Sequence, residues 1–373
     1  IRGAISNRRD FRSKCFRPFN REQIMNIFKV HERIIDDYKS YIKSFLLIKD
    51  ERIKQLVDDE LEGGRLWPEP LIQFNPTFEK GTSIDQLVKD DLVDSNLNHT
   101  FKGFDLYRHQ VEAIKQGVSG KSFIVTSGTG SGKSLTFLAT IFSDLLKNTY
   151  GNGVKAVLVY PMNALINSQE EEIKKYADNY KEETGNEFPL TYSKYTGQEG
   201  QDVREAIKND VPDIILTNYM MLELIMTRGS ELDKIIRRSM FSNLKYLIFD
   251  ELHTYRGRQG ADVSLLIRRI HASTENNVIC IGTSATMSSG GTIAEQKLAV
   301  ANVGKQIFDK EFEEAQIIGE YLENTTITNV IDMVAVKASI SLPIDETQGP
   351  DVFISHPIAI WLENQIALKE LED

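Results

Sequence analysis

The segment 127–134, which reads Ser-Gly-Thr-Gly-Ser-Gly-Lys-Ser, constrains the fold of this chain more than any other feature. It follows a β-rich apolar run and precedes a helical pattern that begins at Lys133. A glycine-rich loop between a strand and a helix offers backbone N–H groups to a phosphate. The lysine supplies a cation for the phosphate oxygens, and Ser134 supplies a hydroxyl for Mg²⁺. The alternative is a glycine-rich turn without a ligand. The predicted phosphate-binding residues are Thr129, Gly130, Ser131, Gly132, Lys133 and Ser134.

The sequence around this loop has the pattern of an α/β fold. Over residues 122–283, short β-rich apolar runs alternate with longer amphipathic helical patterns. Strands that alternate with helices indicate right-handed crossovers and a mostly parallel sheet covered on both faces. The predicted strands are 123–126, 154–160, 190–195, 213–216, 244–249 and 278–281.

Two adjacent acids, Asp250 and Glu251, follow the unbroken apolar run 244–249, which is typical of a buried strand. Ligands of open α/β sheets bind outside the carboxyl ends of the strands, so we expect both acids beside the phosphate loop. We predict that Asp250 holds Mg²⁺ through water and that Glu251 orients and deprotonates an attacking water. Two acids after a strand would by themselves indicate a solvated loop, but their place downstream of the phosphate loop favours the catalytic interpretation.

The order and wording of these motifs resemble a DExH-box helicase of superfamily 2. Lys133 and Ser134 match its motif I, residues 250–253 match motif II, and residues 284–286 match motif III. The segment 161–165 resembles motif Ia, the segment 217–222 resembles motif Ib, and the segment 106–110 resembles the Q-motif region. The resemblance covers residues 100–320 well and the flanks weakly.

The resemblance implies a RecA-like P-loop NTPase lobe that binds ATP and Mg²⁺. It adds Gln110 as the residue that reads the adenine edge, His253 as a member of the catalytic group, and Ser284 and Thr286 as coupling residues. The nucleic-acid backbone would lie across one sheet edge, where N–H groups and hydroxyls hold phosphates without reading bases. The residues expected to contact it are Pro161, Asn163, Gly197, Thr217 and Asn218.

The sequence after motif II narrows the resemblance to one branch. Residues 253–257 and 260–269 look like the corresponding segment of Lhr-like and MrfA-like DNA helicases, which often carry a later DUF1998 region. Residues 317–320 are also similar to that branch, including the DrmA-type helicases of bacterial antiviral defence. This implies translocation on single-stranded DNA and duplex opening in repair or defence, with a defence or repair protein as a possible partner.

The same resemblance implies a second RecA-like lobe, whose arginines act in hydrolysis. The sequence after Thr325 shows no second phosphate loop of this type. Such a cation accelerates phosphoryl transfer by a factor of about 10³ to 10⁵. We therefore expect this chain to bind nucleotide better than it hydrolyses it.

The flanks carry weaker patterns. Residues 22–62 have apolar positions at helical spacing, which predicts two or three amphipathic helices, and the prolines of 64–76 predict an extended connector. We expect a helical N-terminal segment over 1–95, the ATP-binding lobe over 96–325, and a connector toward the second lobe over 326–373, with a last short helix near 358–368. A protein-interaction module over 1–95 is an open alternative.

Charge limits where nucleic acid can bind. A net charge of −10 is unfavourable for covering phosphates over the whole surface, so a nucleic-acid site must be local. The basic residues of the arm 1–21 are accompanied by a single acid, Asp10, and form one candidate site, although a solvated tail is the alternative.

Cys15 and Cys280 form no metal or disulfide pattern. No apolar run is long enough to span a bilayer, so we expect a cytoplasmic protein without membrane association.

Two other functions remain open. An RNA helicase would use the same lobe, and stimulation of ATP hydrolysis by RNA alone would indicate it. A nucleotide-dependent switch or assembly ATPase, which unwinds nothing, would hydrolyse ATP regardless of nucleic acid. The segments that resemble motifs Ia and Ib argue against this second alternative.

Overall fold

The computed structural model describes residues 27–63, 77–128, 130–148, 152–285, 292–341 and 350–367. The chain divides into two compact units, Ile1–Gln73 and Phe74–Asp373. Among the described helices, none has the length and apolar character that a membrane crossing requires. The basic arm with Cys15, the proline-rich connector, Thr129 and Thr286 lie outside the described residues.

The first unit contains, over its described residues, the helices α2 (Ile27–Phe45) and α3 (Glu51–Glu62). The Asp50 carboxylate accepts hydrogen bonds from the backbone N–H groups of Arg52 and Ile53 and so begins α3. Ion pairs join the two helices, with 2.9 Å between Lys43 and Asp58. These helices agree with the amphipathic helices predicted for 22–62.

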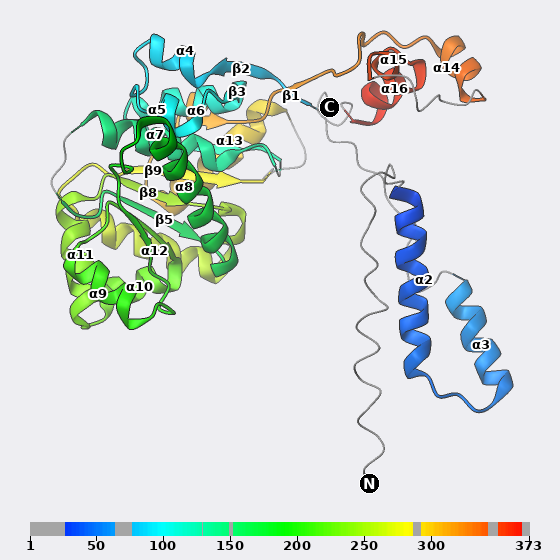
Figure 1. Cartoon of the computed structure of the whole chain (residues 1–373), viewed down its shortest axis with the longest axis horizontal. Coiled ribbons are helices and arrows are strands. Elements are labelled where there is room, and N and C mark those ends of the chain that lie inside the picture. The colour runs from blue at the N-terminus through cyan, green and yellow to red at the C-terminus, as the bar shows by residue number, and fades with distance from the viewer. Residues whose placement is uncertain are drawn as a thin grey trace. The chain divides into compact units, whose positions relative to one another are not determined.

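The second unit is built on a seven-stranded sheet in which every neighbouring pair of strands is parallel (Figure 1). The spatial order is β10-β4-β9-β8-β5-β7-β6. Most strand residues are buried, as expected for a sheet covered on both faces. The strands are β4 (Phe123–Thr126), β5 (Ala156–Tyr160), β6 (Tyr192–Lys194), β7 (Ile214–Asn218), β8 (Tyr246–Phe249), β9 (Ile279–Ser284) and β10 (Ile317–Ile318).

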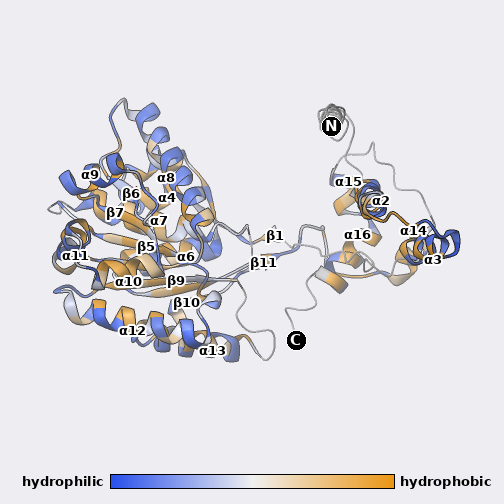
Figure 2. Ribbon diagram, turned by 90° about the horizontal axis from the view of Figure 1, so that it is seen from below, coloured by the Kyte–Doolittle hydropathy of each residue, from blue (hydrophilic) through white to orange (hydrophobic). Residues whose placement is uncertain are grey.

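Helices cover both faces of this sheet, and the apolar residues lie between the layers (Figure 2). One core joins the sheet to α5 (Leu97–Phe101), α6 (Arg108–Val118), α7 (Lys133–Lys147) and α8 (Asn163–Thr184). The other joins it to α9 (Gln201–Asn209), α10 (Tyr219–Thr227), α11 (Glu231–Asn243), α12 (Gly257–Ser273) and α13 (Ile293–Phe308). The predicted α/β fold with a parallel sheet is confirmed.

Residues 77–95 belong to the second unit, so the boundary that we expected at residue 95 moves toward the N-terminus. β2 (Lys80–Ser83) pairs with β3 (Asp105–Tyr107), and β1 (Thr77–Phe78) pairs with β11 (Leu322–Glu323). The helix α4 (Ile84–Lys89) follows β2 and places Ile84 and Leu87, both fully buried, in the core with α5–α7. Burial of these two side chains explains why the segment folds with the sheet.

The C-terminal segment is more helical than the connector that we expected over 326–373. It contains α14 (Met333–Ile340), α15 (Pro350–Ile354), α16 (Pro357–Leu362) and a π-helical turn, Glu363–Ala367. A short 3₁₀ turn, Glu314–Gln316, precedes β10. The helices α14 and α15 were not expected. Asp332 caps α14 by accepting hydrogen bonds from the N–H groups of Val334 and Ala335.

Candidate active site

Three of the predicted motifs lie side by side because their strands are neighbours. β9 lies between β4 and β8, and parallel strands bring their carboxyl ends to one edge of the sheet. The buried Ser284, at the end of β9, connects the other two motifs. Its carbonyl accepts the N–H of Ser127 at 3.2 Å, and its hydroxyl lies 3.2 Å from Nδ1 of His253. The coupling role of Ser284 stays a prediction.

The phosphate loop is held in shape by glycine conformations and by two side chains of α6. Gly130 and Gly132 have φ values of 82° and 72°, in the left-handed region that glycine adopts without strain. Nε2 of Gln110 donates to the carbonyls of Ser131 at 3.2 Å and of Gly132 at 3.1 Å. Nε2 of His109 lies 3.0 Å from the same Ser131 carbonyl.

Gln110, which we expect to read the adenine edge, makes hydrogen bonds to the phosphate loop and to its own helix start in this structure. Its Oε1 also accepts the N–H of Tyr107 at 2.9 Å, and the residue is 4 % exposed. Both amide hydrogens and one oxygen lone pair are therefore used inside the protein. Gln110 supports the phosphate loop, and an adenine contact would require it to give up these bonds.

Lys133 and Ser134 lie where the loop becomes the helix α7. Nζ of Lys133 donates to the carbonyls of Ser127 at 2.8 Å and of Gly128 at 3.2 Å. The residue before the helix, Gly132, has no side chain to cap the first turn. Uncapped N–H groups at the positive end of a helix favour an anion, so this geometry suits a phosphate.

We expect Gly132→Ala to weaken ATP binding and to destabilise the protein more than Gly185→Ala. Both glycines have nearly the same φ, 72° and 73°, so each alanine incurs about 1–2 kcal/mol of backbone strain. A Cβ at position 132 would lie 2.4 Å from Nε2 of Gln110, whereas position 185 has nothing within 4 Å. Urea unfolding and ATP titration measure the two effects. Equal stability of the two variants would show that Gln110 yields without cost.

The two acids differ in their surroundings. The hydroxyl of Thr283 donates to Oδ1 of Asp250, and the N–H of Glu251 donates to the same hydroxyl at 3.3 Å. Burial raises the pKa of Asp250 and outweighs the Thr283 hydrogen bond, which lowers it. Glu251 has a φ of 54°, rare for a residue other than glycine, and such strain is typical of functional sites.

Glu251 has one carboxylate oxygen that no hydrogen bond satisfies. Its Oε2 is buried and has no hydrogen-bond partner. Nδ1 of His253 lies 3.2 Å from this oxygen, near enough for attraction when the imidazole is protonated but not aligned as a hydrogen bond. A buried oxygen without a partner is able to accept a hydrogen bond from a water, as the predicted base requires.

The donor set fits a cation that arrives with a nucleotide. Over the described residues, no group of three His, Cys, Asp or Glu side chains forms a metal cage. Mg²⁺ is commonly bound by one or two carboxylates together with substrate phosphates. The partly buried Asp250 and the hydroxyl of Ser134 are the residues that would hold it.

The ends of β5, β7 and β6 form the other half of the same sheet edge. Nδ2 of Asn218 donates to Oδ1 of Asn163 at 2.9 Å, and Oδ1 of Asn218 accepts the N–H of Met221. Pro161, next to Asn163 at the end of β5, is half-buried. The structure thus brings these three predicted contact residues together.

The other two residues that we predicted to contact nucleic acid, Thr217 and Gly197, use their hydrogen-bond donors inside the protein. Thr217 is fully buried, and its hydroxyl donates to the carbonyl of Tyr195 at 2.7 Å. Gly197 is exposed with a φ of 87°, but its N–H donates to Oε2 of Glu199 at 2.8 Å. Thr217 therefore links the end of β7 to the residue that follows β6. The turn at Gly197 is exposed, but its N–H group is not free to bind a phosphate.

Two residues of the site, Thr283 and Glu320, were not predicted from the sequence. Thr283 orders both acids, and its place directly before motif III was the available signal. Oε2 of Glu320 accepts the N–H of Gly128 at 2.8 Å and so holds the start of the phosphate loop. Glu320 lies far from the loop in sequence, and only the pairing of β10 with β4 brings it there.

The known proteins to which this chain is similar are helicases. Residues 107–292 match the family model described as DEAD/DEAH box helicase. The ATP-dependent helicase MJ1574 of Methanocaldococcus jannaschii is 32% identical over 192 residues, which cover 50% of this chain and 26% of that protein. The ATP-dependent helicase YprA of Bacillus subtilis is 28% identical over 255 residues, which cover 67% of this chain and 31% of that protein. The chain thus spans less than a third of the length of these two relatives.

A solved structure shows the same fold. The crystal structure of the DUF1998 helicase MrfA bound to DNA superimposes with a TM-score of 0.51 and 23% identity. The match covers 66% of this chain and 29% of that one. The predicted RecA-like fold of the lobe is therefore confirmed.

Proposed function

This chain contains a DEAD/DEAH box helicase domain and belongs to that family, and from this premise we propose that it is the ATP-binding lobe of a translocase that moves on single-stranded DNA and opens duplexes. The domain type is an ATP hydrolase, and the relatives are named ATP-dependent helicases. We further propose that residues 96–325, extended toward residue 77, form this lobe, and that a second RecA-like lobe of the same protein completes the site.

One observation supports this function best: both halves of the site share one sheet edge. The phosphate loop and the acids follow β4 and β8, and the segments resembling motifs Ia and Ib follow β5 and β7. The two halves meet where β8 pairs with β5, and the N–H of Asp250 donates to the carbonyl of Val159 at 2.9 Å. A movement of the acids on nucleotide binding would therefore reach the turn at Pro161 directly. A switch that ignores nucleic acid has no use for this second half.

Each residue has a distinct task in hydrolysis. Lys133 binds the phosphate oxygens, Ser134 and Asp250 hold the cation, and Glu251 orients the attacking water and accepts its proton. When bound, Mg²⁺ neutralises the charge that develops on the phosphates. His253 lies between Glu251 and Ser284, so it is positioned to link the acid to the third motif. Arginines of the second lobe would supply the remaining cation.

DNA is the proposed substrate because the structure that shares this fold, MrfA, is a helicase that was bound to DNA. Repair or antiviral defence is the proposed setting. The proposed contacts at the Pro161 and Asn218 turns are made to the sugar–phosphate backbone of the nucleic acid. Such contacts need little net positive charge on the protein. An acidic chain is therefore compatible with a nucleic-acid substrate.

Stimulation of ATP hydrolysis in the full-length protein tests this function. We expect single-stranded DNA to accelerate hydrolysis several-fold, and we expect this chain alone to bind ATP·Mg²⁺ but to hydrolyse it slowly. Oligothymidylate, oligouridylate and duplex DNA of equal length should be compared at one salt concentration. Stimulation by RNA alone would establish an RNA helicase instead, and equal rates with and without any nucleic acid would indicate a switch or assembly ATPase.

A further inference from the structure

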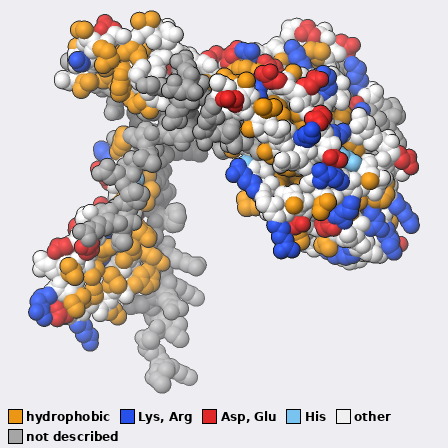
Figure 3. Space-filling model, turned by 180° about the vertical axis from the view of Figure 1, so that it is seen from behind, with side chains coloured by type: hydrophobic (Ala, Val, Ile, Leu, Met, Phe, Trp, Pro, Cys, Tyr) orange, Lys and Arg blue, Asp and Glu red, His pale blue; other side chains and the backbone are white. Residues whose placement is uncertain are grey.

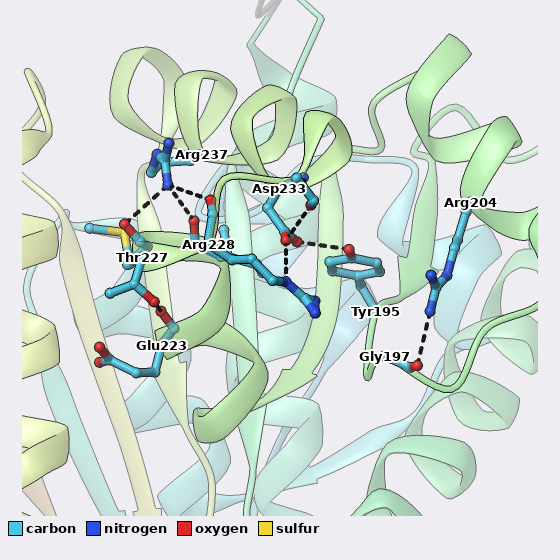
Figure 4. Close-up of polar contacts among 11 residues, drawn as sticks. Tyr195, Gly197, Arg204, Glu223, Thr227, Arg228, Asp233 and Arg237 are labelled. Atoms are coloured by element: carbon cyan, nitrogen blue, oxygen red, sulfur yellow. Dashed lines mark hydrogen bonds and ion pairs between the residues drawn. The ribbon is translucent and has the colours of Figure 1, made fainter.

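A group of arginines lies at the end of the sheet edge that β6 forms, beyond the residues already described. Arg204 comes from α9, Arg228 from the loop between α10 and α11, and Arg237 from α11 (Figure 4). Tyr195 directly follows β6 and contacts this group, so the group lies at the carboxyl edge of the sheet. Lys and Arg side chains are also frequent on the lower half of the α/β domain in the view of Figure 3.

A buried carboxylate orients Arg228. Asp233 is fully buried and accepts hydrogen bonds from Nε of Arg228 at 2.8 Å, from the hydroxyl of Tyr195 at 2.8 Å and from Ser230. Burial alone would raise the pKa of Asp233, but the hydrogen bonds from Ser230, Arg228 and Tyr195 hold it below its ordinary value. The carboxylate therefore stays ionised and fixes the guanidinium through Nε.

This bond leaves the forked end of Arg228 accessible. Its side chain is 46% exposed, and Nε, rather than the terminal amino groups, binds Asp233. Figure 4 shows the guanidinium beside the ring of Tyr195, with Gly197 and Arg204 on the other side of that ring. A guanidinium held by one nitrogen presents its terminal amino groups to a phosphate, which arginine binds with two parallel hydrogen bonds.

Arg204 contacts the turn at Gly197, across the Tyr195 ring from Arg228. Its Nη2 donates to the carbonyl of Gly197 at 3.0 Å, and its Nε is buried without a hydrogen-bond partner. Arg237, by contrast, donates to the carbonyls of Ile225, Met226 and Arg228, so it serves the end of α10. Arg204 thus contacts the Gly197 turn, and Arg228 lies on the other side of the Tyr195 ring from that turn.

We infer that Arg204 and Arg228 bind phosphodiester groups of a nucleic-acid strand where it passes the Gly197 turn. The inference rests on the proposed function and extends the strand-binding edge past β7 to β6. The N–H of Gly197 is already bonded to Glu199, and the Thr217 hydroxyl is buried. Phosphate contacts at this end of the edge must therefore come from side chains, and these two arginines supply them. Asp233 and Tyr195 are positioning residues for Arg228.

The test compares charge removal at the two edges of the sheet in the full-length protein. Arg228→Gln and Arg204→Gln remove a charge at the carboxyl edge. Lys121→Gln removes one at the amino edge, where Lys121 precedes β4 and lies 3.8 Å from Glu313. The affinity of fluorescein-labelled oligothymidylate is measured as a function of KCl concentration. Thermal unfolding and ATP binding of each variant check that the fold and the nucleotide site are intact.

For each arginine variant we expect the magnitude of the slope of log affinity against log salt to fall by about 0.7. Over the tenfold range from 1 M to 0.1 M salt, this change corresponds to about fivefold weaker binding than wild type at 0.1 M. Lys121→Gln should keep the wild-type slope. If wild type binds the oligonucleotide and both arginine variants keep its slope, the inference is overturned. If wild type itself does not bind, the proposed function fails instead. Should Arg228→Gln not fold, Arg204→Gln still decides.

Discussion

Glu251→Gln in the full-length protein is expected to slow ATP hydrolysis by about 10² to 10⁴-fold, the usual contribution of a general base. The affinity for ATP·Mg²⁺ should stay close to that of wild type, because the substitution keeps the shape of the side chain and removes only its basicity. Single-turnover hydrolysis and a nucleotide titration measure the two quantities separately.

The structure explains why this substitution should leave the fold intact. Oε2 of Glu251 has no hydrogen-bond partner, so an amide there breaks no bond that the carboxylate makes. The φ of 54° is as unfavourable for glutamine as for glutamate, so the backbone strain does not change. Glu187→Gln is the matched control, since Glu187 is 80% exposed and pairs with Lys181 at the surface. Near-normal turnover in Glu251→Gln would remove this residue from the role of the base.

Asp250→Asn should give the opposite pattern, with Mg²⁺-dependent nucleotide affinity reduced. Burial raises the pKa of Asp250, so the carboxylate takes up its proton at a higher pH than an ordinary aspartate does. Mg²⁺-dependent affinity of wild type should therefore decline on acidification through that raised pKa, while the asparagine variant shows no such step. In the metal-free protein, the raised pKa means that stability falls as pH rises from the ordinary to the raised value. Equal affinity losses in the Glu251 and Asp250 variants would show that the two roles are assigned wrongly.

The strand ends were predictable from sequence because local signals define them. Short apolar runs such as β8 and β5 end at polar or turn residues, and a buried strand followed by Asp250 leaves few alternatives. The order of the strands is not a local property. β9 is the sixth of the sheet strands in sequence yet lies beside β4, and only long-range packing places it there. The expected parallel sheet already indicated that the acids would lie beside the phosphate loop, and the resemblance to helicases added the other motifs.

The roles of individual polar side chains were harder to predict for a physical reason. A glutamine or threonine at a strand or helix end satisfies its hydrogen bonds either with a ligand or with nearby backbone, and sequence does not distinguish these partners. Gln110 and Thr217 took the backbone partner. Likewise, the short strands β1 and β2 gave no strong periodic signal, and burial of Ile84 and Leu87 decided to which unit this segment belongs.

Lys133→Ala is expected to weaken ATP binding by about 10 to 150-fold. A hydrogen bond to a charged group contributes about 1.5–3 kcal/mol, and each 1.4 kcal/mol is a factor of ten in affinity. In the structure Nζ of Lys133 contacts the carbonyls of Ser127 and Gly128 of the loop itself. Loss of this side chain therefore removes the cation that binds the phosphate and one support of the loop, but no part of the apolar core. Isothermal titration with ATP·Mg²⁺ measures the affinity.

Thermal unfolding without nucleotide separates binding from folding in this variant. Lys147→Ala is the control, because Lys147 lies at the other end of the same helix, is 49% exposed and pairs with Asp91. Both variants should unfold close to the wild-type temperature without ATP, since each loses only a partly exposed charge. With ATP, wild type and Lys147→Ala should be stabilised and Lys133→Ala should not, because a ligand stabilises only a protein that binds it. Loss of the unfolding transition in Lys133→Ala alone, without ATP, would mean that the loop depends on this lysine for its fold and not only for its ligand.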